Sequence, residues 1–173
     1  MIKRVAITGP ESTGKSELAK SLAEYYNTVW LPEYSREYLK QKKGTYEFDD
    51  IVEIAKGQLK REDEMALKAN EYLFCDTDLF VTKIWSEYKY GKCDHWIFEK
   101  ILTHQYDLHL LMDIDLDWKP DPLRENPDDR QKLFDIYMEE LAQYKYPFFI
   151  IDGKGEARVK AAIQVINNFF LLI

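Results

Sequence analysis

The pattern of apolar residues alternates between two periodicities along the chain. Five short runs rich in β-branched, aromatic and other apolar residues predict buried strands, at 4–8, 28–31, 72–75, 108–112 and 148–151. Between them, apolar residues recur at the spacing of amphipathic helices, at 15–26, 33–42, 48–69, 79–90, 94–104, 127–144 and 156–170. Strands that alternate with helices are typical of a parallel sheet covered on both faces. We therefore expect an α/β fold, a three-layer α/β/α sandwich around a five-stranded parallel sheet.

Two places within this pattern carry predictions of their own. Gly57 interrupts the helix expected at 48–69, where glycine costs about 1 kcal/mol relative to alanine, so a kink or a close contact is expected there. The longest apolar run is 169–173. Burial of this run against the sheet is the favoured interpretation. The alternative is a contact between two copies of the chain, which would make the protein a homo-oligomer.

Composition and charge restrict the class of protein. The chain has 173 residues, 46% of them hydrophobic and 32% charged, which predicts one packed domain over 1–173. The net charge of −7 argues against a nucleic-acid partner, because nucleic-acid-binding surfaces are basic. The apolar runs are too short to cross a bilayer and the N-terminus lacks signal-peptide features, so we expect no membrane partner and a cytoplasmic location. Cys75 and Cys93 have no disulfide-type or metal-type spacing and are predicted to be reduced, with Cys75 buried.

Residues 9–16, Gly-Pro-Glu-Ser-Thr-Gly-Lys-Ser, match the phosphate-binding P-loop pattern G-x-x-x-x-G-K-[ST] at every fixed position. A strand is predicted before the motif and a helix after it. The glycines let the backbone approach phosphates, the loop N–H groups point inward, and the helix N-terminus adds partial positive charge. Lys15 is expected to reach the β- and γ-phosphates and Ser16 to bind Mg²⁺. The expected nucleotide-binding residues of the loop are Gly9, Glu11, Ser12, Thr13, Gly14, Lys15 and Ser16.

Acidic residues follow the next two predicted strands. Glu33 comes after the second strand, and Asp76 and Asp78 come after the third. Ligands of open parallel sheets bind at the carboxyl ends of the strands, where carboxylates can hold Mg²⁺ or deprotonate an attacking hydroxyl. Structural alternatives remain open: Asp78 as a helix N-cap, Asp76 as a solvated turn acid, and Glu33 as a first-turn helix acid paired with Arg36.

The stretch 113–130 differs from the rest of the chain because it is acidic and contains three prolines. This composition predicts a mobile loop or lid. Phosphoryl transfer is catalysed by positioning and by charge stabilisation, which makes Arg124 a candidate catalytic residue and Arg130 a candidate nucleotide contact. The alternative is that Arg124 is a surface residue and that Arg130 pairs with Asp128 or Asp129 at the start of a helix.

Four segments together resemble a known family. They are Gly-Pro-Glu-Ser-Thr-Gly-Lys-Ser at 9–16, Pro-Glu-Tyr-Ser-Arg-Glu-Tyr at 32–38, Cys-Asp-Thr-Asp at 75–78 and Asp-Pro-Leu-Arg at 121–124. In this order they are similar to the kinase domain of NadR-type proteins, nicotinamide riboside kinases that are often fused to a nicotinamide mononucleotide adenylyltransferase. The Glu-Tyr-x-Arg-Glu and Asp-Thr-Asp elements are the specific ones. No His-x-Gly-His motif occurs in the chain, so adenylyltransferase activity is not expected.

The resemblance implies a P-loop NTPase fold of the nucleoside-kinase type with a lid, and Mg²⁺ and ATP as cofactors. It implies that Glu33, Tyr34 and Arg36 lie at the riboside. It implies that Asp76 and Asp78 lie near the acceptor hydroxyl and Mg²⁺, and it assigns the two arginines of 113–130 to the lid. The corresponding role is in NAD salvage, with a small-molecule riboside as substrate.

Two functions remain open. One is an ATP-dependent kinase that phosphorylates the 5′-hydroxyl of nicotinamide riboside or a related riboside. The other is an NTP-binding or NTP-hydrolysing switch without small-molecule kinase activity. The acceptor also stays open, because Pro32 occupies the position where the family can offer an aromatic residue to stack on the pyridine ring, with Trp30 two residues earlier. The choice of ATP over GTP, and of the base among Glu33, Asp76 and Asp78, is not determined by the sequence.

Overall fold

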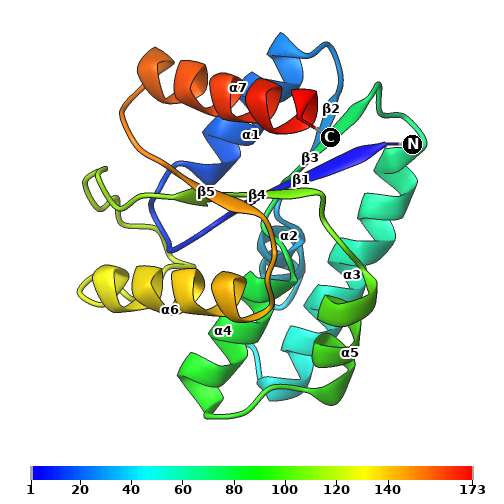
Figure 1. Ribbon diagram of the computed structural model, residues 1–173. Coiled ribbons are helices and arrows are strands. Elements are labelled where there is room, and N and C mark those ends of the chain that lie inside the picture. Colours follow the sequence, from blue (N-terminus) through cyan, green and yellow to red (C-terminus); the bar gives the residue numbers. More distant parts are fainter. Residues whose placement is uncertain (1, 173) are drawn as a thin grey trace.

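The computed structural model describes residues 2–172 and contains a five-stranded sheet in the order β2-β3-β1-β4-β5 (Figure 1). Each strand is parallel to its neighbours. The strands are β1 (Lys3–Thr8), β2 (Val29–Leu31), β3 (Tyr72–Asp76), β4 (Leu108–Met112) and β5 (Phe148–Ile151). The helices are α1 (Lys15–Tyr25), α2 (Tyr34–Gln41), α3 (Phe48–Ala66), α4 (Leu79–Tyr90), α5 (His95–Thr103), α6 (Arg130–Gln143) and α7 (Glu156–Leu171).

The central strand β1 brings the carboxyl ends of three strands together. Ile7 of β1 pairs with Asp76 of β3 on one side and with Leu110 of β4 on the other. Strands β3 and β4 are buried along their whole length, as expected of parallel strands covered on both faces. The P-loop, the residues after Asp76 and the segment after β4 therefore begin at the same edge of the sheet.

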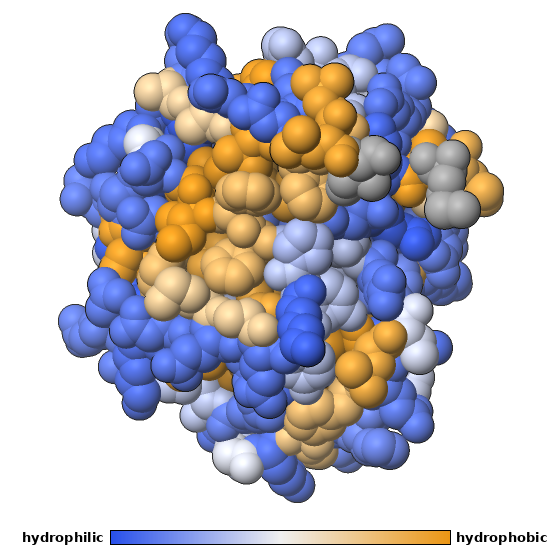
Figure 2. All heavy atoms as spheres, in the orientation of Figure 1, coloured by the Kyte–Doolittle hydropathy of each residue, from blue (hydrophilic) through white to orange (hydrophobic). Residues whose placement is uncertain are grey.

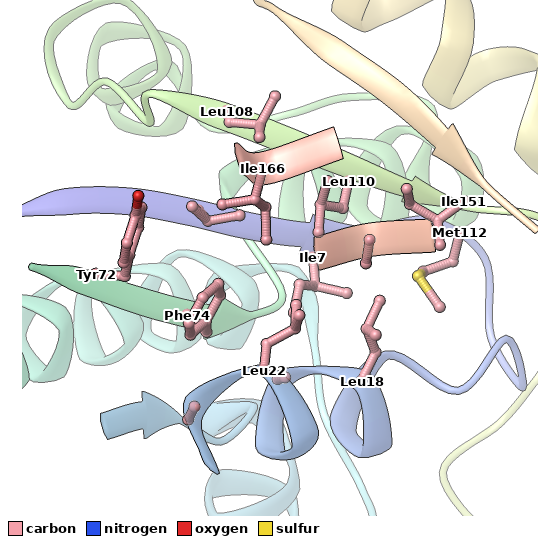
Figure 3. Packing of buried hydrophobic residues seen from close by; sticks show 14 residues of the cluster. Ile7, Leu18, Leu22, Tyr72, Phe74, Leu108, Leu110, Met112, Ile151 and Ile166 are labelled. Carbon is pink, nitrogen blue, oxygen red and sulfur yellow. The ribbon is translucent and has the colours of Figure 1, made fainter. Parts of the chain in front are cut away.

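Helices α1 and α7 cover one face of the sheet, the upper face in Figure 1. Figure 3 shows Leu18 and Leu22 of α1 and Ile166 of α7 directed toward Ile7 and Leu110 of the central strands. These residues have exposed fractions of 2% or less. The apolar positions of the short strands and of the flanking helices thus form a single packed layer.

Helices α3, α4, α5 and α6 cover the other face (Figure 1). Their buried side chains form a second cluster that includes Ile51, Phe80, Ile97 and Tyr137. The two layers of helices and the sheet between them confirm the predicted three-layer α/β/α fold with five parallel strands. Cys75 in β3 is fully buried, as predicted.

Some local predictions hold and others are wrong. Helix α3 is continuous through Gly57, and a Cβ atom there would lie 2.0 Å from Cε1 of Tyr34. The close-contact interpretation is therefore confirmed. Burial of the C-terminal run is wrong for Leu171 and Leu172, which are 81% and 87% exposed. Residue 173 lies outside the described residues.

Strand β5 forms an apolar edge of the sheet. Among the described residues β5 is the last strand of the sheet and pairs with β4, and its Phe149 and Ile150 are 42% and 47% exposed. Figure 2, in the orientation of Figure 1, shows apolar surface gathered over this strand and the adjoining part of α7. Within residues 2–172, no helix combines the length and apolarity that a membrane span requires.

Candidate active site

The P-loop connects β1 to α1, and its two glycines adopt conformations that other residues rarely reach. Their φ angles are 126° at Gly9 and 81° at Gly14. A Cβ atom at Gly9 would lie 3.1 Å from the carbonyl oxygen of Met112, so the loop also passes too close to β4 for a side chain. The Thr13 hydroxyl donates to the carbonyl oxygen of Pro10 at 2.8 Å. Because Gly14 is the N-cap of α1, the first N–H groups of the helix are directed at the loop.

Lys15 is held inside its own loop. Its Nζ donates to the carbonyl oxygens of Gly9 at 2.8 Å and Pro10 at 2.7 Å. Withdrawal of the ammonium group from solvent lowers the pKa of Lys15, and the nearby carboxylates of Glu33 and Asp76 oppose this effect. The lysine is thus a partly desolvated cation at the mouth of the loop, where the phosphates of a bound nucleotide would approach.

Ser16 and Asp76 form the predicted metal-binding pair. The Ser16 hydroxyl donates to Oδ2 of Asp76 at 2.5 Å. Ser16 lies in the first turn of α1, directly after the P-loop, and Asp76 ends β3, the strand that pairs with β1. The other carboxylate oxygen, Oδ1, is buried without a hydrogen-bond partner. Burial, and then the charge of Glu33, raises the pKa of Asp76 to about 6.

The Ser16 hydroxyl and the Asp76 carboxylate, with its unpartnered Oδ1, fit Mg²⁺. This ion prefers oxygen ligands and usually keeps several ligands from phosphates and water. Among residues 2–172, there is no cluster of three or more His, Cys, Asp or Glu side chains that could hold a metal ion. The pair Ser16 and Asp76 is therefore the part of the described chain that fits a nucleotide-bound Mg²⁺.

Asp78 is a capping residue. Its Oδ1 accepts hydrogen bonds from the backbone N–H of Val81 at 3.0 Å and from the Thr8 hydroxyl at 3.1 Å. The side chain is fully buried, which raises the pKa of Asp78 to about 7. The N-cap interpretation is confirmed. The side chain does not line the cavity described below, and a role of Asp78 at the substrate stays a prediction.

Glu33 and Arg36 lie together at the start of α2. Oε1 of Glu33 accepts a hydrogen bond from the Ser35 hydroxyl at 2.6 Å, and its Oε2 lies 3.3 Å from Nε of Arg36. Nη1 of Arg36 also donates to Asp121 at 3.0 Å. Tyr34, predicted at the riboside, does not line the cavity described below. Its ring packs on α3 at Gly57, where the absence of a side chain makes room for it.

A cavity of about 840 Å³ joins the P-loop to the start of α2. One end is formed by the P-loop together with Arg124 and Lys154. The other end is formed by Glu33 and Arg36 and by apolar and aromatic side chains, which are Leu39, Val81, Ile84, Trp85, Tyr88, Leu133 and Tyr137. Its volume lies in the range of small-molecule sites, and a phosphate-binding end is continuous with a largely apolar end.

The predicted lid runs without regular secondary structure from the end of β4 to the start of α6 and lies against the P-loop. The backbone N–H groups of Glu125 and Asn126 donate to the Glu11 carboxylate at about 3.1 and 3.0 Å. The Ser12 hydroxyl accepts from the backbone N–H of Lys119 at 2.9 Å. These contacts fix the segment, hereafter the lid (residues 113–129), over the nucleotide end of the cavity.

Both lid-side arginines reach the P-loop. Arg124 donates to the Ser12 hydroxyl at 3.4 Å, and Arg130, the first residue of α6, donates to the Ser12 carbonyl at 3.3 Å. Arg130 also donates to the carbonyl oxygen of Leu116 at 2.8 Å. The alternative pairing of Arg130 with Asp128 or Asp129 does not occur within the described part of the chain.

Several residues at the site are not apparent from the sequence. Arg158 of α7 is 5% exposed and donates to the carbonyl oxygen of Thr13 at 2.6 Å and to Asp115 of the lid. The sequence did indicate that Arg158 is buried, because it lies on the same face of its helix as the apolar residues Ala162 and Ile166. The aromatic end of the cavity comes from α4 and α6, and no motif marks it.

The comparisons agree with this geometry. A sheet with a P-loop after its central strand and a lid over it defines the P-loop kinase fold. The chain belongs to the family described as AAA domain, whose model matches residues 4–158.

The chain is 29% identical over 174 aligned residues to the Trifunctional NAD biosynthesis/regulator protein NadR of Escherichia coli (strain K12), and the match covers 96% of this chain and 42% of that protein. The chain thus spans less than half the length of this curated relative. A crystal structure of NadR protein in complex with NR superposes with a TM-score of 0.74 at 25% identity, covering 97% of this chain and 49% of that one. Thymidylate kinase from Ehrlichia chaffeensis, 14% identical with a TM-score of 0.68 over 95% of this chain and 98% of that one, shares the fold. The resemblance to NadR-type proteins is confirmed.

Proposed function

We propose that the protein is an ATP-dependent kinase that transfers the γ-phosphoryl group of Mg²⁺-bound ATP to the 5′-hydroxyl of nicotinamide riboside or a related riboside. The observation that carries the proposal is the continuous cavity, which places the carboxylate of Glu33 and an apolar, aromatic end beside the P-loop. The similarity to NadR, one of whose structures is described as a complex with NR, supports a riboside as acceptor. We further propose that residues 1–173 act as a single unit.

The donor half follows from the P-loop. The loop N–H groups and Lys15 would hold the β- and γ-phosphates, and Ser16 and Asp76 would hold Mg²⁺, which neutralises charge on the phosphates when bound. Arg124 and Arg130 reach the same loop from the lid and would stabilise the charge that develops on the transferred group. Glu11 would act by holding the lid closed through its hydrogen bonds to the lid backbone.

In the acceptor half, we assign the base to Glu33. Glu33 lines the cavity, whereas Asp76 and Asp78 do not, so Glu33 is the candidate carboxylate that can meet an acceptor hydroxyl there. It would accept the proton of the 5′-hydroxyl as the oxygen attacks phosphorus. Ser35 and Arg36 fix its orientation, which is what a positioned base requires.

A second function is an ATPase or nucleotide switch that acts without a small acceptor, in keeping with the description of the family as AAA domain. A water-activating ATPase of the AAA+ type would carry a second acid directly after Asp76, and this chain has Thr77 there. The apolar end of the cavity also has no role in hydrolysis. Both observations favour the kinase.

The direct test incubates the purified protein with Mg²⁺, ATP and nicotinamide riboside, and follows ADP and the phosphorylated riboside by mass spectrometry. ADP formation that depends on the riboside supports the proposal. Glu33→Gln is expected to lower kcat by about 10²- to 10⁴-fold, the usual contribution of a positioned base. Glu37→Gln is the matched control, because Glu37 lies one turn further along α2 and pairs with Arg61 outside the cavity.

ADP formation at the same rate with and without a riboside would support the switch or ATPase instead. Turnover of common nucleosides but not of nicotinamide riboside would keep the kinase class and correct the acceptor.

A further inference from the structure

Tyr46 lies in the connection between α2 and α3, and its hydroxyl contacts three side chains from two other parts of the chain. It donates to Oε2 of Glu125 in the lid at 2.7 Å. It accepts from Nε1 of Trp85 at 2.8 Å and from Nζ of Lys89 at 2.5 Å, both in α4. Nζ of Lys89 also donates to Oε1 of Glu125 at 2.8 Å, which closes the cluster.

The direction of each hydrogen bond in this cluster is determined by its members. An indole N–H and an ammonium group can only donate, and an ionised carboxylate can only accept. A phenol offers one donor and two acceptor positions, so the Tyr46 hydroxyl is fully used. Burial raises the pKa of Tyr46 to about 12, and the hydroxyl therefore keeps its proton for Glu125 near neutral pH.

The partners of Tyr46 line the cavity, and Tyr46 does not. Trp85, Lys89 and Glu125 are all cavity residues. The Tyr46 ring packs against the Trp85 indole with centroids 4.8 Å apart and an interplanar angle of 68°. Packing and the hydrogen bond to Nε1 together leave the indole a single orientation in the apolar end of the cavity.

Glu125 attaches the lid at both ends of the cavity. Its side chain binds Tyr46 and Lys89 at the aromatic end, and its backbone N–H donates to the Glu11 carboxylate of the P-loop at 3.1 Å. Closure of the lid over the nucleotide and the orientation of Trp85 therefore depend on the same residue. The Tyr46 hydroxyl binds Glu125 and Trp85 at the same time, so it connects the position of the lid to the orientation of the indole.

We propose that Tyr46 is a positioning residue for the acceptor, whose hydroxyl couples closure of the lid through Glu125 to the orientation of the Trp85 indole against the ring of the bound acceptor. The inference rests on the proposed kinase function and deepens it, since it assigns the residue that makes acceptor binding depend on the lid. It predicts that removing the Tyr46 hydroxyl weakens binding of the acceptor through its ring and leaves the position of the hydroxyl that receives the phosphate unchanged.

The test compares Tyr46→Phe with Tyr90→Phe in the full chain. Tyr46→Phe keeps the ring and removes three hydrogen bonds. Tyr90 is the control, because its hydroxyl donates to the backbone carbonyl of Tyr46 at 3.4 Å, outside the side-chain cluster, and because Tyr90 does not line the cavity. The measurements are steady-state kinetics with nicotinamide riboside and ATP, and hydrogen exchange of residues 113–129 in the presence of Mg²⁺ and a non-hydrolysable ATP analogue.

Tyr46→Phe is expected to raise KM for the riboside about tenfold, equivalent to ~1.4 kcal/mol, with KM for ATP unchanged within about twofold. Amide exchange in the lid should become faster in Tyr46→Phe and not in Tyr90→Phe. Adding Glu125→Gln to Tyr46→Phe should raise the riboside KM less than the two single effects combined, because both act on one contact.

Equal increases in KM for riboside and ATP would mean general loosening of the fold and would overturn the proposal, as would identical kinetics in the two tyrosine variants. If the wild-type protein phosphorylates no riboside, the kinase proposal fails, and the exchange experiment still decides the coupling. Equal exchange of the lid in both variants would then show that Tyr46 does not hold it.

Discussion

At the scale of single residues, Arg158 illustrates how a buried charge can support a phosphate site without touching the phosphate. Its guanidinium group joins the P-loop carbonyl of Thr13 to the lid residue Asp115. Asp115 in turn accepts a hydrogen bond from the backbone N–H of Gly153 at 2.6 Å. The planar guanidinium group of Arg158 thus connects the P-loop to the lid, and Asp115 connects the lid to the turn before α7.

Lysine cannot reproduce this geometry, so Arg158→Lys is expected to weaken nucleotide binding. It keeps the charge but leaves one of the two acceptors without a partner. We expect the free energy of unfolding to fall by about 1–3 kcal/mol, the usual cost of a buried polar group left without a partner. We also expect KM for ATP to rise while KM for the riboside stays constant. Urea denaturation and steady-state kinetics measure the two effects. Lys160→Arg, on the exposed side of the same helix, is the control.

His109 in β4 provides a test of the buried electrostatics. Its ring is fully buried with Nε2 3.4 Å from Oδ2 of Asp78. Burial lowers the pKa of His109 from its usual 6.5 to about 3, and burial raises the pKa of Asp78 to about 7, so both groups are uncharged in much of the acidic range. The folded state binds fewer protons at His109 than the unfolded state between pH 6.5 and 3, so the contribution of His109 to stability is lost as the pH falls through this window. The raised pKa of Asp78 has the opposite sign and loses its contribution as the pH rises from about 4 to 7.

His109→Gln removes only the histidine contribution. Its cost in unfolding free energy should be largest at pH 8 and should shrink by about 2 kcal/mol at pH 5, which is 1.5 units below the unfolded pKa of histidine. Urea denaturation of wild type and variant at pH 8, 6.5 and 5 measures the difference. A cost that is the same at all three pH values would show that folding does not lower the pKa of His109.

The candidate site could be predicted from the sequence where side-chain roles follow from backbone position. Lys15, Ser16 and Asp76 were identified because a P-loop and the end of an adjacent strand meet at one edge of a parallel sheet. Asp78 and Tyr34 show the limit of that argument. They lie only two residues and one residue beyond Asp76 and Glu33, respectively, but Asp78 caps a helix and Tyr34 turns toward Gly57. Which way a side chain turns depends on neighbours that are distant in sequence.

At the scale of elements, the contact between α2 and α3 positions the start of α2 and with it the cavity residues Glu33 and Arg36. The ring of Tyr34 fills the space that Gly57 leaves open, and the guanidinium group of Arg61 lies over that ring, with Cζ 4.6 Å from its centroid. The backbone N–H of Tyr34 also donates to Oε1 of Gln58 at 3.0 Å. This contact fixes the first turn of α2, which carries the carboxylate of Glu33.

Gly57→Ala is therefore expected to destabilise the protein, although alanine is the better helix former. A helix interior gains about 1 kcal/mol from the change, but a Cβ atom 2.0 Å from the Tyr34 ring forces α2 to move, and overpacking of this kind costs about 1–3 kcal/mol. In a Tyr34→Ala background the same substitution should be neutral or stabilising. Urea denaturation of the four proteins of this double-mutant cycle gives the coupling, and a cost that persists without the ring would refute the packing argument.

The existence and order of the elements could be predicted because each has a clear hydrophobic period and a clear boundary. The boundary of α6 was less accurate: the helix was expected from 127 and begins at Arg130. Pro127 is tolerated in a first helical turn, so the sequence permits both starts. The choice follows from the contacts of Arg130 with Ser12 and Leu116, which belong to tertiary structure.

At the scale of the whole molecule, the lid contacts two parts of the cavity, the P-loop after the central strand β1 and the start of α2 after the edge strand β2. Glu11 holds the lid on the P-loop side. On the α2 side, Arg36 forms an ion pair with Asp121 of the lid at 3.0 Å while its Nε lies 3.3 Å from Glu33. A backbone N–H and the guanidinium group of Arg36 lower the pKa of Asp121, which keeps this ion pair charged in the working pH range.

Because the lid touches both halves, a ligand in either half should favour the closed arrangement for the other. We expect a non-hydrolysable ATP analogue with Mg²⁺ to tighten nicotinamide riboside binding by about 5-fold or more, within the usual range of coupling between sites, and the riboside to tighten nucleotide binding by the same factor. Asp121→Asn removes the charge that reaches α2 and should bring this factor close to one. Asp128→Asn, an exposed lid acid, should leave it unchanged. Isothermal titration calorimetry in both orders of addition measures the factor, and a wild-type value of one would mean that the lid acts on each ligand separately.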